Sequence, residues 1–193
     1  MKKVTVLSGL FLLMITATGV LFAAEAEDGF GSSNKIEGKY FTIYYSQQID
    51  ISKLSRQLDI TAMDKILAGK SVGEDIASEP ELAKMVDILY GLVGDMIDMH
   101  VYNFKGGIKI CEDQAQLNNI YKNLFNKDLV SYMVSFYVSD TSTIYISGES
   151  FKREILGHEI AHAIINHYFV VSPPVKVQEI LSKYIEYQLR KAQ

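Results

Sequence analysis

The stretch that decides the fold lies in a run of strongly helical composition and reads Gly157-His158-Glu159-Ile160-Ala161-His162. Two histidines four positions apart project from one face of a helix, about one turn apart, so both imidazoles can reach a single ion. Glu159 is rotated by about 100° from His158 and is better placed to reach a water in an open coordination position. The spacing therefore predicts a metal centre with His158 and His162 as ligands and Glu159 as general base.

The residues around this motif favour a buried helix over two histidines on an ordinary amphipathic surface helix. Burying two imidazoles and a carboxyl without a common binding partner would cost free energy of folding. Most sides of the helix are apolar, with Ile155, Leu156, Ile160, Ala161, Ala163, Ile164 and Ile165.

A catalytic zinc site needs a third protein ligand and one open position. His167 follows His162 by five residues and points about 140° away on a continuing helix, so it is badly placed. Glu179 comes early in the next helix, after the turn at Pro173-Pro174, which allows that helix to fold back toward the metal. We expect Glu179 to be the third ligand, and Glu186, two turns further on, to lie too far from the histidines.

The remainder of the chain predicts an α+β arrangement in which a small mixed β-sheet is packed with helices. A Ser-Asp-Thr turn separates two of the strand-like runs and predicts a hairpin. The expected strands are residues 39–45, 107–111, 131–138 and 142–147, and the expected helices are 50–63, 78–98, 113–124, 149–168 and 175–190.

Composition places the chain among ordinary globular proteins. Its 193 residues are 48% hydrophobic and 22% charged, which suits one domain. The net charge of −4 and the lack of a basic cluster argue against nucleic acid as a partner. Cys111 is the single cysteine, so no internal disulfide can form, and we expect it to be a buried apolar residue.

The N-terminus has the pattern of a secretory signal. Lys2 and Lys3 precede an uncharged stretch from Val4 to Ala24, and Ala24 and Ala26 supply the small residues of a cleavage site. Residues 1–26 are thus expected to be a cleaved signal, with an uncleaved membrane anchor as the alternative. Residues 27–38 are expected to be a flexible lead-in to one domain over 39–193. The protein would then be periplasmic or secreted, with no stable membrane association once the signal is removed.

Residues 157–162, together with Pro173-Pro174 and the run from Gln178 to Tyr184, resemble the gluzincin clan of zinc metallopeptidases, and small minimal gluzincins most closely. The resemblance implies a zincin-like fold, in which the active-site helix is followed by a helix whose glutamate, here Glu179, completes a site for one Zn²⁺. It also implies that a strand, here Thr143–Ser147, borders the cleft and pairs with extended substrate. One departure is that Ser182 and Lys183 stand where thermolysin-like members carry an Asp that braces a zinc-binding histidine.

These observations predict an exported zinc metallopeptidase that hydrolyses peptide bonds of peptide or protein substrates. A metal-activated water would attack the peptide carbonyl, with Glu159 as general base. The alternative is a catalytically inactive exported domain that binds zinc and serves in interactions. A further possibility is a latent enzyme whose residues 27–60 cover the cleft. The donor that stabilises the oxyanion stays open among Tyr184, His167 and Tyr168.

Overall fold

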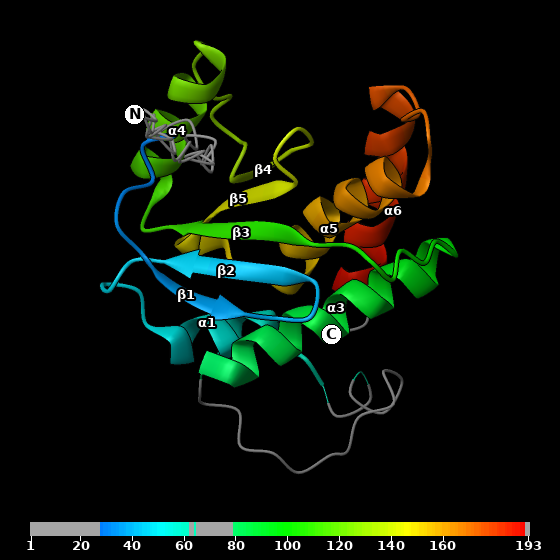
Figure 1. The fold of residues 1–193 in the computed structure, drawn as a ribbon, viewed down its shortest axis with the longest axis horizontal. Coiled ribbons are helices and arrows are strands. Elements are labelled where there is room, and N and C mark those ends of the chain that lie inside the picture. Colours follow the sequence, from blue (N-terminus) through cyan, green and yellow to red (C-terminus); the bar gives the residue numbers. More distant parts are fainter. Residues whose placement is uncertain (1–27, 62–63, 65–78, 192–193) are drawn as a thin grey trace, which may run out of the picture.

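A five-stranded mixed sheet forms the centre of the molecule (Figure 1). The computed structural model describes residues 28–61, 64 and 79–191. The strand order is β1-β2-β3-β5-β4. The three inner strands run parallel, whereas both edge strands run antiparallel to their neighbours. The strands are β1 (Asn34–Glu37), β2 (Phe41–Tyr45), β3 (Gly106–Cys111), β4 (Ser135–Val138) and β5 (Thr143–Ser147).

Helices cover both faces of this sheet, so the predicted α+β class is confirmed. One helix packs on one face and four pack on the other, as the two groups of buried side chains show. The helices among the described residues are α1 (Ile51–Leu58), α3 (Glu79–Ile97), α4 (Gln114–Phe125), α5 (Arg153–Tyr168) and α6 (Val175–Lys191), with a short 3₁₀ turn at Gly148–Ser150.

Two helices begin where the sequence predicts, because an aspartate caps each. The Asp50 carboxylate accepts hydrogen bonds from the amides of Ser52 and Lys53, and the Asp113 carboxylate accepts one from the amide of Gln116. These amides have no partner inside the helix, so a side-chain acceptor at the N-cap stabilises the helix start.

The core has two parts that lie on opposite faces of the sheet. The larger part packs α1, α3, α5 and α6 against one face, and the smaller part packs α4 against the other. In β5, Ile144 and Ile146 face the larger part and Tyr145 faces the smaller, as alternation along a strand requires. Cys111 is buried in the smaller part, as expected from the sequence.

Helices α5 and α6 pack closely and run antiparallel. A Cβ atom on Gly157 would lie 2.2 Å from Leu189 Cδ1 and 3.6 Å from Ile185 Cγ2. Leu189 is fully buried, so a larger residue at position 157 would require this side chain to change its position. Glycine thus favours the close approach of the two helices at this point.

The prediction of a flexible lead-in over residues 27–38 is wrong for the described residues 28–38. β1 pairs with β2 along its whole length, and Phe30 is buried against α4. Asp28 is buried as well and accepts hydrogen bonds from Lys109 Nζ, Tyr145 Oη and the Phe30 amide. The polar composition of the segment misleads because these residues are held by backbone pairing and one buried carboxylate, which periodicity does not reveal.

Two parts of the sequence predictions fall outside the described residues: the secretory signal over 1–26 and the first residue of the helix expected over 78–98. Among the described helices, none combines the length and the apolar character needed to cross a membrane.

The buried carboxylate of Asp28 makes stability depend on pH. Burial raises its pKa, but the hydrogen bonds from Lys109, Tyr145 and Phe30 outweigh that effect and leave the pKa lowered in the folded protein. Asp28→Asn should lower the free energy of unfolding by about 2 kcal/mol at neutral pH. Because the folded-state pKa lies below the unfolded one, the stabilisation is present at neutral pH and disappears as the pH falls through the folded-state value.

Urea unfolding of the parent and the variant, repeated from about pH 7 to about pH 3, measures this difference. The exposed turn residue Asp140 provides the control, since Asp140→Asn should leave the free energy of unfolding unchanged at each pH. A difference between parent and Asp28→Asn that stays constant over the whole range would contradict the prediction.

Candidate metal centre

Helix α5 carries the two histidines on one face, as predicted. His158 Nε2 and His162 Nε2 lie 3.2 Å apart, and both side chains are largely buried. The four-residue spacing places the rings one turn apart, and their inner nitrogens converge on one point. The convergence of these two nitrogens is the starting geometry of a metal site.

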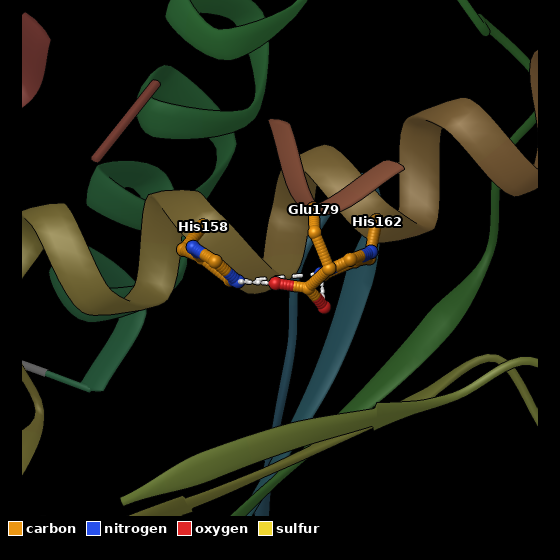
Figure 2. A group of neighbouring side chains, drawn as sticks. All are labelled: His158, His162 and Glu179. Carbon is orange, nitrogen blue, oxygen red and sulfur yellow. Dashed lines mark hydrogen bonds and ion pairs between the residues drawn. The ribbon is translucent and has the colours of Figure 1, made fainter. Parts of the chain in front are cut away.

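Helix α6 brings Glu179 to the same point (Figure 2). Its Oε1 lies 3.3 Å from His162 Nε2, and its Oε2 lies 3.8 Å from His158 Nε2. Figure 2 shows the carboxylate between the two imidazole rings. One ligand atom from each of the three residues falls within 4.8 Å of the others, so the structure brings together all three residues chosen from the sequence.

The spacing of these atoms fits a tetrahedral ion. Bonds of about 2.1 Å at tetrahedral angles place neighbouring ligand atoms about 3.4 Å apart. The 3.2 Å between the two imidazole nitrogens is close to that value, and each nitrogen has a different oxygen of Glu179 nearby, at 3.3 Å for His162 and 3.8 Å for His158. Two imidazoles and one carboxylate are also a donor set that suits zinc and leaves a fourth position for water or substrate.

Both histidines favour the neutral form that binds a metal. Burial lowers the pKa of His158, while the carboxylates of Glu179 and Glu186 oppose the effect. Burial lowers the pKa of His162 too, and the neighbouring His158 adds to this decrease. A neutral imidazole has a free electron pair, so neither ring needs to lose a proton at neutral pH to become a ligand.

Glu186 also belongs to the site, contrary to the expectation that it lies too far away. Its Oε2 lies 3.4 Å from His158 Nδ1, at ion-pair distance. Because α6 runs antiparallel to α5, each step toward the C-terminus of α6 moves back along α5, from His162 toward His158. Glu186 therefore lies beside the outer nitrogen of His158, at ion-pair distance and without hydrogen-bond geometry.

A polar network lies beside His162. The Gln178 side chain opposes the lowering of the pKa of this ring. Its amide oxygen accepts a hydrogen bond of 2.8 Å from Asn166 Nδ2, and its amide nitrogen donates to the carbonyl of Pro173. The network ties the end of α5 to the turn and the first residues of α6. Sequence reasoning missed Asn166 and Gln178, since their roles depend on the packing of the two helices.

Glu159 lies on the cleft side of α5 and is 5% exposed. Its Oε1 accepts a 2.7 Å hydrogen bond from Ser135 Oγ on β4. Burial raises the pKa of Glu159 to about 7, the Ser135 hydrogen bond opposes this, and the carboxylates of Glu179 and Glu186 add to it. The fold thus buries an ionisable carboxyl at a cost in stability, as expected for a group with a chemical role.

A cleft of about 900 Å³ opens over these residues. Its walls are α5, α6 and the edge strand β4. The expectation that Thr143–Ser147 borders the cleft and offers its backbone to substrate is wrong. That strand, β5, is paired with β3 on one side and β4 on the other, whereas β4 has a single partner among the described strands.

None of the three candidates for an oxyanion donor lines the cleft. His167 contacts Ser142 and the carbonyl of Ala163, whereas Tyr168 and Tyr184 are exposed to solvent outside the cleft. The cations that do line the cleft are Lys152, Lys183 and Arg190.

The cleft also bears on the hypothesis of a latent enzyme. Every described residue that lines it lies between Tyr132 and Arg190, so the described part of 27–60 does not cover it. Strands β1 and β2 lie instead toward the opposite edge of the sheet (Figure 1).

Comparison of the chain with protein-family models, curated proteins and solved structures finds no match. The likeness to gluzincins therefore rests on the residues of α5 and α6 themselves.

Zinc binding should require Glu179. We expect the purified protein to hold about one zinc ion per chain after a mild chelator challenge, and Glu179→Ala to lose it, because two imidazoles alone bind too weakly. Metal analysis after dialysis measures the stoichiometry. Glu112→Ala removes an exposed carboxylate outside the cleft and should retain the zinc. Equal retention by all three proteins would exclude Glu179 as a ligand.

The contact between Glu186 and His158 gives a separate prediction. Glu186→Gln should weaken zinc binding by about tenfold, since the charged acceptor that orients His158 and increases its basicity is lost. Competition with a chromophoric chelator measures the affinity, with Glu112→Gln as the control. An unchanged affinity would show that Glu186 contributes nothing to the site.

Proposed function

We propose that the protein is a zinc-dependent metallopeptidase that acts after export. The observation that carries the proposal is the convergence of His158, His162 and Glu179 in a cleft that Glu159 also faces. The three ligand residues leave a coordination position open, as a catalytic site requires. The N-terminal pattern of basic, uncharged and small residues supports export.

The chain's own residues supply positioning and proton transfer. A bound zinc ion would activate water and polarise the peptide carbonyl. Glu159 accepts the proton of the attacking water and passes it to the leaving amine. Ser135 holds Glu159 Oε1, while Oε2 makes no hydrogen bond within the described part of the chain. One carboxylate oxygen is thus fixed by β4, and the other is available for the proton.

The free edge of β4 is the natural place for the substrate backbone. An extended peptide can add to an unpaired strand edge through main-chain hydrogen bonds, which makes binding insensitive to most side chains. Residues of β4 line the cleft, and Ser135 connects this strand to Glu159. A peptide paired with β4 would lie across the cleft and close to the three candidate ligands.

The alternative is a domain that binds zinc for structural or interaction purposes. Such a site usually closes with four protein ligands, and it has no use for a carboxyl beside it. The 5% exposure of Glu159 and its raised pKa make this residue costly to keep, which favours the enzyme.

Replacing the general base should separate chemistry from metal binding. Glu159→Gln should retain about one zinc per chain and lower peptide hydrolysis by about 10²–10⁴-fold, because proton transfer is lost while the ligands stay in place. Cleavage of a quenched fluorescent peptide library gives the rate, with Glu112→Gln as the control. Hydrolysis by Glu159→Gln at the rate of the parent protein would contradict the proposed mechanism. A parent that binds zinc and cleaves no peptide would favour the interaction domain.

A further inference from the structure

The outer side of α6 carries an apolar stripe that no described residue covers. Val177, Ile180, Tyr184 and Tyr187 recur at intervals of three and four residues, which places them on one face of the helix. Their side chains are 43–60% exposed. The stripe is about 15 Å long at 1.5 Å per residue. Isolated exposed apolar residues are common, but a continuous stripe of this length marks an interaction surface.

More exposed apolar side chains precede α6. Val170 is 105% exposed and Val171 82%, and Tyr168 and Phe169 at the end of α5 are also exposed. The stripe and these residues together form what we call the α6 surface: residues 168–171, 177, 180, 184 and 187.

The charge along this surface is positive, although the whole chain has a formal net charge of −4. Lys176, Lys183 and Arg190 form a row beside the stripe, at the next positions around the helix. No Asp or Glu occurs between Tyr168 and Gln178. The two carboxylates of α6, Glu179 and Glu186, contact the histidines, and Glu186 also pairs with Arg190. The net positive charge of the row therefore comes from Lys176 and Lys183.

We propose that the α6 surface binds an anionic lipid bilayer, with α6 lying in the plane of the membrane interface. Aliphatic and tyrosine side chains flanked by lysine and arginine are the composition of helices that lie at a membrane surface. Lipid headgroups supply the negative charge that the row of cations requires. The uncharged stretch from Val4 to Ala24 also brings the chain to a membrane during export.

This proposal differs from the expectation of no stable membrane association, and it does not rest on the proposed peptidase activity. It has one consequence for the cleft. Lys183 and Arg190 stand between the apolar stripe and the carboxylates of the site, and both also line the cleft. A bilayer on the α6 surface would therefore leave the cleft open to solvent next to the membrane. A polypeptide segment that emerges from the bilayer would then lie beside the cleft.

The chain contains no tryptophan, so a single introduced one reports on contact with lipid. Residues 27–193 include every helix and strand of the described fold and lack the apolar stretch that would bind vesicles by itself. In this form, Val171→Trp should show a blue-shifted emission and quenching by brominated lipid when vesicles with about one-third phosphatidylglycerol are added. Val130→Trp, at an exposed apolar position outside the α6 surface, should show neither change.

Cosedimentation with the same vesicles measures the binding. The combined change Val171→Asp and Ile180→Asp should lower binding by at least about tenfold, while Val130→Asp should not. Both replaced side chains are exposed, so circular dichroism and zinc content should match the parent. Binding should weaken in high salt and be at least about tenfold lower on pure phosphatidylcholine vesicles.

Three results would overturn the proposal. These are absence of binding to the anionic vesicles, equal binding of the combined variant and the parent, and equal binding to vesicles of pure phosphatidylcholine. A dimer of residues 27–193 that the combined variant dissociates, together with no vesicle binding, would assign the α6 surface to a second copy of the chain. None of these results depends on peptide hydrolysis. The proposal of membrane binding and the proposal of peptidase activity are therefore tested independently.

Discussion

The close, antiparallel packing of α6 against α5 is the contact on which the candidate site depends. It occurs at Gly157, where the absence of a side chain lets Leu189 fill the space between the helices. Side chains that meet in this way fix the rotation of one helix relative to the other. With the rotation fixed, Glu179 faces both histidines of α5. A larger residue at position 157 would have to displace the buried side chain of Leu189.

The same packing explains the electrostatics of the site. The two helices exclude water from the histidines, which lowers the pKa of both and keeps them neutral. The carboxylates of Glu179 and Glu186 supply negative charge on the side of α6. This charge, with burial, raises the pKa of Glu159. A divalent cation bound among these groups would relieve the repulsion between them, so the arrangement is better suited to an ion than to an empty cleft.

Helix α6 presents three chemically different sides. One side carries Ser182, Ile185 and Leu189 and is buried against the rest of the fold. The second carries the two glutamates of the site, and the third is the α6 surface, apolar and bordered by cations. A period of 3.6 residues is enough to separate these roles along 17 residues. The helix can therefore contribute to the core, the candidate metal centre and an outer contact at the same time.

Edge position in the sheet decided which strand faces the cleft. The sequence pattern identified the hairpin of β4 and β5 correctly, but it could not rank the two strands. Both have apolar residues, and only the pairing of β5 with β3 shows that β4 is the free edge. Likewise, the polar strand β1 has no hydrophobic signal, since three of its four residues are exposed. Backbone pairing between distant segments held it in place.

Local spacing alone predicted the starts of the helices at Asp50 and Asp113 and the pairing of His158 with His162. Each of these depends on residues within about one helical turn, and the geometry of one turn is the same in every protein. The contact of Glu186 with His158, the support of Glu159 by Ser135 and the exposed stripe of α6 were decided only by the tertiary structure. The two contacts join segments far apart in the chain, and the exposure of the stripe depends on which side of α6 packs against the fold. Both follow from how helices and strands pack, which no short-range pattern encodes.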